Sequence, residues 1–346
     1  MLKQLPHGIT SPLSRTARLR RLLHRGEIAL SQGDLSTAEH RGRSALALLD
    51  DTANHRSAAD EAGIELRVAS LELVARARRE LTDFTAAVLL YRQALADLEA
   101  ARTTVGNERR LVPVLNGLGE ALRLLGRFSE AEEHSRRAVQ VAERIRPADP
   151  MVLAAALNGL GIVFKDTGRF RDAAAAYERA LHLCEQALGP NDPRIANVLH
   201  NLAGLAHAEG RPTEGEAHVR RGLQLREQAG GPASTGTASD LAVLGAVLLE
   251  QHRITEAEPI LQQSLAIWED RFGQEHYEVA IVQHNLAALY AERGDHDRAA
   301  LAYRQVLHIK RHVLGRNHPE VAALENHLAV VTSRCMYRRS EGEPGC

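Results

Sequence analysis

The residues of this chain that could do chemistry are mostly histidines, and their spacing favours no catalytic or metal site. Among the 17 histidines, His308 and His312 lie four residues apart, as on one helical face, and His318 follows. No third ligand stands at a spacing characteristic of zinc, so we expect no metal site. The chain also lacks a glycine-rich phosphate loop, a G-x-S-x-G motif and an H-E-x-x-H motif. We therefore expect no cofactor and no catalytic residue.

The cysteines and the apolar segments favour a cytoplasmic protein. Cys184, Cys335 and Cys346 show no paired spacing, which is typical of a reducing compartment. Cys184 lacks the cationic neighbours or helix-start position that would activate its thiol. No segment approaches the roughly 18 apolar residues of a membrane span, and the N-terminus lacks the apolar region of a signal peptide. We expect no membrane partner.

Helices must position any site in this chain. Residues 157–193 contain one helical pattern before Gly168-Arg169-Phe170 and a second pattern after it. The first pattern places Leu157, Leu160 and Phe164 on its core face. Neither helix can bury its apolar stripe alone, so this helix–turn–helix unit needs neighbours.

The same unit recurs along the chain with a period of about 42 residues. A turn residue, usually glycine, precedes each second helix, and looser copies begin near Gly33 and Thr82. The spacing predicts about seven helix pairs and a final single helix. The small residue that opens the second helix is Ala131, Ala173, Gly215, Ala257 and Ala299 in the regular repeats.

Two segments carry a resemblance to a known family. They are L-G-P-N-D-P-R-I-A-N-V-L-H-N-L-A-G-L at 188–205 and L-G-R-N-H-P-E-V-A at 314–322. The chain resembles tetratricopeptide repeat proteins of the long-repeat type, found in kinesin light chains and many bacterial relatives. The resemblance is good over 107–334 and loose over 13–104. It implies an all-α, right-handed α-solenoid with a concave groove that binds peptides or partner proteins.

We expect five segments in this solenoid. They are a flexible leader (1–12), two divergent repeats (13–104), five regular repeats (105–317), a C-terminal capping helix (318–334) and a disordered tail (335–346). In addition, the segment 229–238 contains three glycines, a proline and no charge. It is either a hinge in the superhelix or an ordinary loop between repeats.

The charge balance does not favour nucleic acid as a partner. The 43 Lys and Arg residues are matched by 44 Asp and Glu residues. The first helix is basic, with several arginines between Arg15 and Arg25. These arginines are either a nucleic-acid contact or the polar outer side that a terminal repeat needs, and we expect the second.

The resemblance also locates the groove, because the first helix of each tetratricopeptide pair lines the concave side. The positions fifteen, eleven and eight residues before the small residue of the second helix share one face of the first helix. Asn158, Ile162 and Lys165 occupy these positions in the central repeat. The predicted peptide-binding residues along the groove are Arg76, Arg79, Asn116, Arg123, Asn158, Lys165, His200, Gly204, His207, Ala246, Leu249 and His284.

The chemistry of this groove changes along the chain. Arg79, Arg123 and Lys165 make the N-terminal half partly basic, whereas small and apolar residues make the C-terminal half drier. Exposed basic residues are common on any helix, so a solvated surface is the alternative. Asn158 matches an asparagine of the L-N-N-L-A motif of kinesin light chains, with Gly159 in place of the second asparagine. We expect a partner segment that is extended and acidic and carries a bulky apolar residue.

Three functions remain open from the sequence. The first is a non-catalytic scaffold that binds an extended segment of a partner protein. The second is a regulatory receptor for a short signalling peptide, as in Rap proteins, with residues 13–81 as the effector region. The third is an accessory subunit that completes or activates a partner enzyme. The sequence indicates neither the partner nor the oligomeric state.

Overall fold

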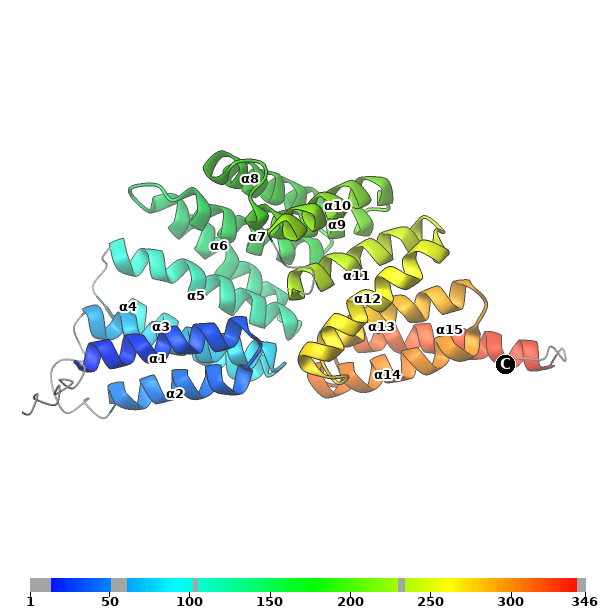
Figure 1. Cartoon of the computed structure of the whole chain (residues 1–346), viewed down its shortest axis with the longest axis horizontal. Helices are drawn as coiled ribbons and strands as arrows, with labels where there is room; N and C mark the ends of the chain where they lie inside the picture. The colour runs from blue at the N-terminus through cyan, green and yellow to red at the C-terminus, as the bar shows by residue number, and fades with distance from the viewer. Residues whose placement is uncertain (1–13, 51–60, 102–104, 230–233, 341–346) are drawn as a thin grey trace, which may run out of the picture.

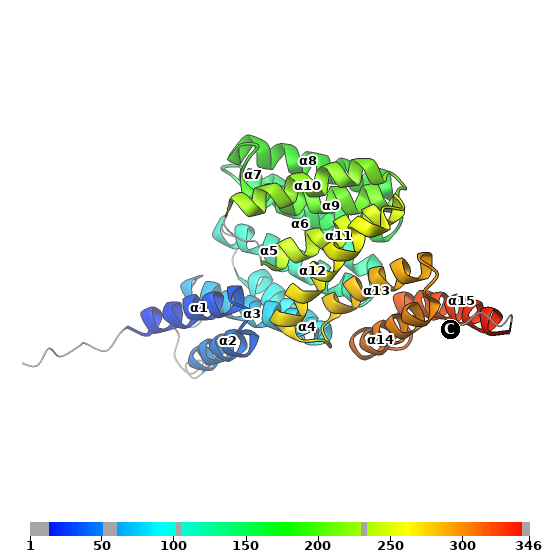
Figure 2. The same ribbon diagram turned by 45° about the vertical axis from the view of Figure 1, so that its right-hand side comes forward.

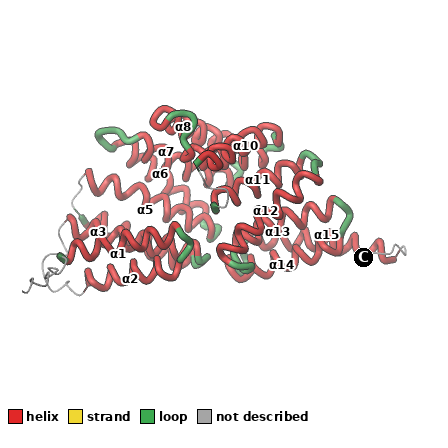
Figure 3. Tube along the Cα trace, viewed as in Figure 1, coloured by secondary structure: helices red, strands yellow, loops and turns green. Residues whose placement is uncertain are grey.

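The protein is an all-helical array. The computed structural model describes residues 14–50, 61–101, 105–229 and 234–340. Within these ranges it contains fifteen α-helices, one short 3-10 helix and no strand (Figure 3). The predicted all-α class, with seven helix pairs and a final helix, is confirmed.

The helices follow one another in pairs that are joined by tight turns, and a 3-10 helix, η2 (Pro193–Ile195), precedes α9. The pairs are α1 (Arg15–Ser31) with α2 (Leu35–Asp50), α3 (Glu61–Glu80) with α4 (Phe84–Ala100), α5 (Val105–Leu124) with α6 (Phe128–Arg144), α7 (Pro150–Asp166) with α8 (Phe170–Leu188), α9 (Ala196–Ala208) with α10 (Pro212–Gln228), α11 (Thr235–Glu250) with α12 (Ile254–Phe272), and α13 (Tyr277–Glu292) with α14 (His296–Leu314), followed by α15 (Pro319–Ser340).

The odd-numbered helices form one layer of the array and the even-numbered helices form the other. From α1 to α13, each odd-numbered helix packs against its own partner and against the next odd-numbered helix. Each even-numbered helix packs between its partner and the odd-numbered helix that follows. The array bends into an arch (Figure 1). The contacts between odd-numbered helices place them on the inner side, which we call the inner face.

Within a pair, the two helices approach most closely where the odd-numbered helix has little or no side chain. A methyl group at Gly161 would lie 2.5 Å from the ring of Tyr177, and one at Gly119 would lie 2.7 Å from the Ser135 hydroxyl. Gly245 has the same relation to Leu261. The equivalent positions in the other two regular repeats are Ala203 and Ala287.

The turn inside each pair needs a left-handed backbone. The predicted turn residues Gly126, Gly168, Gly210 and Gly294 have φ between 67° and 83°. Two repeats place a larger residue there, Thr82 at φ 61° and His252 at φ 57°. Side chains with a Cβ adopt this conformation at an energetic cost, so it is the surrounding repeat that imposes the turn.

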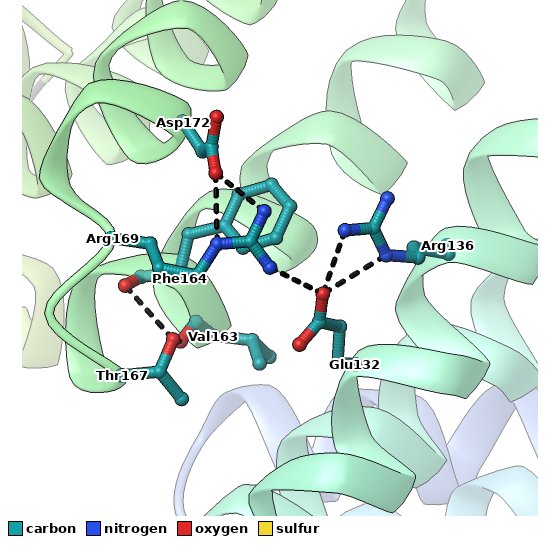
Figure 4. Close-up of polar contacts among 7 residues, drawn as sticks. All are labelled: Glu132, Arg136, Val163, Phe164, Thr167, Arg169 and Asp172. Atoms are coloured by element: carbon teal, nitrogen blue, oxygen red, sulfur yellow. Dashed lines mark hydrogen bonds and ion pairs between the residues drawn. The ribbon is translucent and has the colours of Figure 1, made fainter.

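Ion pairs join neighbouring repeats at the start of the even-numbered helices (Figure 4). The Arg169 guanidinium donates from Nε to Asp172 at 2.8 Å and from Nη1 to Glu132 of the preceding repeat at 2.6 Å. It also covers the Phe164 ring, 4.3 Å from the ring centroid. Because exposed ion pairs contribute little to stability, their main effect is on the register between repeats. The same arrangement recurs with Arg253, Glu256 and Glu216.

The N-terminal helices of the array touch the end of α12 and the start of α13, which the sequence did not predict. In Figures 1 and 2, the end of α12 lies beside α1–α4. Three contacts join these segments: Arg271 Nη2 donates to the Ser31 carbonyl (2.7 Å), His276 Nε2 donates to the Glu80 carbonyl (2.9 Å), and the rings of Phe84 and Tyr277 meet edge to face at 6.1 Å. We call this set of contacts the closure.

The expected segments correspond only partly to the observed helices. Helix α15 continues to Ser340, past the expected end of the capping helix at 334. The last four residues of the glycine-rich segment 229–238 are helical, because α11 begins at Thr235. The leader 1–12 and the residues 230–233 and 341–346 lie outside the described residues.

The close approach within each pair leads to a prediction about stability. Gly161→Ala should lower the free energy of unfolding by about 1–2 kcal/mol, because the methyl group overlaps the buried Tyr177 ring. Gly204→Ala is the matched change in another odd-numbered helix, where the nearest atom, Lys165 Nζ, would be 3.9 Å away. It should raise stability by about 0.5–1 kcal/mol through better helix propensity. Urea unfolding followed by circular dichroism measures both, and equal shifts would contradict this packing.

Candidate functional site

The predicted groove residues all lie on odd-numbered helices, from α3 to α13. Because these helices pack side by side, the residues form a strip along the inner face. His207 is exposed, and the other eleven side chains are half-buried. They are therefore neither core residues nor fully solvated ones.

The two arginines of α3 and α5 nearest the turns are already paired within the chain. Arg79 Nη1 donates to Glu120 on the next odd-numbered helix. Arg123 Nη1 donates to Asp166, again on the next odd-numbered helix, at 2.8 Å. These pairs join neighbouring inner helices and compensate much of the predicted basic charge.

Lys165 is the basic residue of the strip with the weakest internal pairing. Among the described residues, its only carboxylate neighbour within ion-pair distance is Asp166, at 3.5 Å. Its side chain is 29% exposed. The ammonium group also lies beside Gly204 of the next inner helix, where no side chain covers it. Lys165 is thus the charge on the strip that is most available to a ligand.

The two histidines of α9 pair with carboxylates of α11. His200 Nδ1 lies 2.9 Å from Asp240 Oδ1, and His207 Nδ1 lies 2.7 Å from Glu250 Oε2. Asp240 is fully buried and also accepts a 2.7 Å hydrogen bond from Arg226 Nε. A buried carboxylate needs such partners, so His200 helps to join two repeats.

His284 on α13 has a different environment. Its ring packs against Tyr303 and His327, each at a centroid distance of 5.5 Å. Burial, together with the nearby charge of Lys310, lowers the pKa of His284 to about 4. It is therefore a neutral ring at physiological pH.

Asparagines occupy the middle of the strip. Asn158 Oδ1 accepts a 2.8 Å hydrogen bond from Asn201 Nδ2 on the next inner helix. This bond orients the Asn158 amide and leaves its own N–H groups without a partner among the described residues. Asn116 Oδ1 is buried without a hydrogen bond, close to Gly159 of the following inner helix. Both amides therefore keep hydrogen-bonding capacity that the chain does not use.

Near the closure, charged residues of α3 and α5 lie close to charged residues of α13 and α14. Burial, reinforced by the Glu80 carboxylate, raises the pKa of Glu278 at the start of α13 to about 7. Arg123 and Lys310 oppose this rise, and Glu120 adds to it. On α3, burial also raises the pKa of Glu72 to about 7. The inner face here is a mixed charged environment rather than a basic one.

The structure gives little support to metal or thiol chemistry. Across the part of the chain that the structure describes, no group of three His, Cys, Asp or Glu side chains is placed to hold a metal ion. His308 lies 3.7 Å from Glu275, while His318 Nδ1 accepts a hydrogen bond from the Glu320 N–H. Cys184 is buried, and burial raises the pKa of its thiol, which disfavours a reactive thiolate. No described helix is long and apolar enough to span a bilayer.

The sequence matches a model of one protein family over most of its repeats. The tetratricopeptide repeat model matches four overlapping stretches, 110–186, 152–228, 194–270 and 238–312, which together span more than half of the chain. The chain belongs to the tetratricopeptide repeat family. No curated protein matches the sequence significantly.

Solved structures with the same tetratricopeptide architecture share little sequence with this chain. The apo form of RapI is 13% identical, with a TM-score of 0.61 over 85% of this chain and 97% of RapI. A Rap protein complexed with Competence and Sporulation Factor is 15% identical, with a TM-score of 0.60 over 91% and 87% of the two chains. A tetratricopeptide repeat protein from Parabacteroides merdae is 13% identical, with a TM-score of 0.51 over 91% and 99%. At these identities the likeness shows the fold alone.

Sequence reasoning missed the acidic partners in this tetratricopeptide array. Four basic or imidazole side chains of the strip precede their carboxylates by roughly one repeat, in the pairs Arg79–Glu120, Arg123–Asp166, His200–Asp240 and His207–Glu250. The signal was available as a basic residue followed about 42 residues later by an acidic one. Recognising it required knowing that consecutive inner helices lie side by side.

The raised pKa of Glu278 leads to a prediction about pH. The folded state holds its proton up to about pH 7, whereas an unfolded glutamate loses it near 4.5. The stability contribution of Glu278 therefore falls as pH rises from about 4.5 to about 7. Glu278→Gln should reduce this slope and raise stability at pH 8 by about 1–3 kcal/mol.

Chemical unfolding at pH 5 and pH 8 measures this effect. Glu275→Gln is the matched control, because that carboxylate is 75% exposed on the neighbouring turn. The control should keep the slope of the unmodified protein. A Glu278→Gln variant that is no more stable at pH 8 than the unmodified protein would contradict the assignment.

Proposed function

We propose that the protein is a non-catalytic scaffold that binds an extended peptide segment of a partner protein along its inner face. The observation that carries the proposal is the strip of half-buried polar and small side chains on consecutive inner helices. Such a strip offers hydrogen bonds, one weakly paired charge and space, without the close titratable constellation of an active site. Membership in the tetratricopeptide family supports this class of function.

Asn158 is the central recognition residue in this proposal. An extended peptide exposes backbone N–H and C=O groups that need partners once water is displaced. Asn201 Nδ2 donates a hydrogen bond to Asn158 Oδ1 and so fixes the orientation of the amide. The Asn158 N–H groups are then available to donate to a peptide carbonyl. Asn116, one repeat earlier, offers a further amide to the same peptide.

Lys165 and the small residues after it define the side chains of the ligand. Lys165 is placed to bind an acidic side chain, with Arg123 beside the shared Asp166 as a secondary contact. Gly204, Ala246 and Leu249 leave room for a bulky apolar side chain farther along the strip. The proposed ligand is therefore an extended acidic segment with one bulky apolar residue.

Binding to a partner identified by co-purification and mass spectrometry tests this proposal. Asn158→Ala should weaken binding of the partner segment by about 1–3 kcal/mol, through the loss of a buried hydrogen bond. Lys165→Glu combined with Arg123→Glu should weaken it more, and most strongly at low salt. Isothermal titration at two salt concentrations measures both effects.

Arg220→Glu supplies the control, because it reverses a charge on α10 of the outer layer, where the side chain is 49% exposed. Its affinity for the segment should equal that of the unmodified protein. If the inner-face variants fold and bind normally while Arg220→Glu does not, the binding surface lies on the outer layer.

A receptor for a short signalling peptide is the second candidate. It is favoured by the closure, because a peptide on the inner face would reach residues that join the N-terminal helices to α12 and α13. The similarity to a Rap protein solved with Competence and Sporulation Factor suggests this possibility through the fold alone. Retention of a protein segment in the co-purification supports the scaffold, whereas capture of a free oligopeptide that changes the shape of the protein supports the receptor.

A further inference from the structure

A cavity lies at the closure, between the N-terminal helices and α11–α12. Its volume is about 200 Å³, which is smaller than the roughly 300–1,000 Å³ of sites for drug-sized ligands. One wall comes from α1 to α3 and the other from α11 and α12. The lining combines three arginines, Arg76, Arg79 and Arg271, with one carboxylate, Glu80, and with apolar side chains that include Leu30 and Phe272.

The three guanidinium groups differ in how far the chain compensates their charge. Arg79 pairs with two carboxylates, Glu80 and Glu120, and Arg76 pairs with Glu27 at 2.9 Å. Arg271 has no carboxylate within ion-pair distance in the part of the chain that the structure describes. One positive charge at the cavity is therefore left without a counter-charge.

Arg271 is held in place by neutral contacts only. Its Nη2 donates to the Ser31 carbonyl, and its guanidinium carbon lies 5.7 Å from the Phe272 ring centroid. Its Nε is buried without a hydrogen bond, packed against Gly33. A side chain at Gly33 would begin 3.0 Å from that nitrogen, so the absence of one permits the approach. A half-buried guanidinium without a counter-ion is a costly arrangement that an anionic ligand would relieve.

The chemistry of the lining indicates the class of ligand. One uncompensated guanidinium matches one carboxylate, which it can bind with two parallel hydrogen bonds. Thr235, the first residue of α11, also lines the cavity, so the positive end of that helix adds to the attraction. The apolar lining at Leu30, Leu35 and Phe272 suits a short hydrocarbon body attached to the carboxylate.

We infer that this cavity binds a small monocarboxylic acid with a short apolar body, and that the bound acid holds the N-terminal helices against α11 and α12. Arg271 binds the carboxylate, and Phe272 and Leu30 contact the hydrocarbon. Binding of the acid stabilises the closure because the two walls of the cavity belong to segments about 200 residues apart in the sequence. This inference does not rest on the proposed peptide binding, since the test uses no peptide.

Titration with sodium hexanoate tests the inference in the full-length protein. Trp268 is the only tryptophan, and it stacks on Phe272 at 5.8 Å, so its fluorescence reports on the cavity. We expect a saturable fluorescence change and matching heat in calorimetry. The neutral isostere hexanamide, acetate and inorganic phosphate should each bind at least about tenfold more weakly, since each lacks the charge, the apolar body or the planar shape.

Two variants locate the binding. Arg271→Gln should weaken hexanoate binding at least about tenfold. Thr235→Glu should do the same by placing a carboxylate in the cavity, and an acidic residue in the first turn of α11 keeps the helix stable. Thr235→Gln matches the size of glutamate without its charge and should bind more tightly than Thr235→Glu, whereas the outer-layer Arg220→Gln should bind as the unmodified protein does.

The outcomes decide the inference even where Arg271→Gln loosens the closure. Weaker binding in a folded Thr235→Glu variant than in Thr235→Gln supports the site. Absence of saturation, equal binding of hexanamide or phosphate, or full affinity in Thr235→Glu overturns it. Unchanged protection of the α1–α3 amides from hydrogen exchange at saturating hexanoate overturns the coupling to the closure.

Discussion

The close approach of the two helices in each repeat is the contact on which the rest of the structure depends. It occurs where the inner helix carries glycine or alanine, as at Gly161 against Tyr177. The short distance lets an alanine-rich and leucine-rich chain bury its side chains with an aromatic content of only 3%. Because the contact recurs every 42 residues, each pair presents the same surface to the next pair, and the array propagates.

Many charged side chains of both layers form ion pairs within the array. On the outer side, Arg169 joins its own repeat to Glu132 of the preceding one. On the inner face, Arg79 and Arg123 pair forward with the following helix. A tetratricopeptide array thus uses most of its surface charge to keep the repeats in register. In the proposed function, a partner binds polar side chains that the repeats leave weakly paired, chiefly Asn158 and Lys165.

The closure changes how the inner face should be understood. In an open superhelix, α3 and α5 would present their charged residues to solvent. Here Glu278 is buried at the start of α13, and this burial, reinforced by the Glu80 carboxylate, raises its pKa. The contact between the N-terminal helices and α12 also creates a cavity around Arg271, which neither segment forms alone. Local contacts form the array, whereas contacts over large sequence separations bury Glu278 and form the cavity at Arg271.

The sequence by itself determined the helical class, the period and the turn positions, and the resemblance to tetratricopeptide proteins implied which helices form the inner face. These features depend on apolar spacing and on residues near one another in the chain, so Leu157, Leu160 and Phe164 were correctly placed in the core. The period also predicts the positions of the turns at Thr82 and His252, whereas their left-handed backbone is a finding of the structure. Only the tertiary structure decided that Arg79 and Arg123 are paired, because pairing requires the exact rotation of one inner helix against the next. It alone decided the closure as well, since small rotations between repeats add up over the array, and no local pattern records whether Arg271 reaches Ser31.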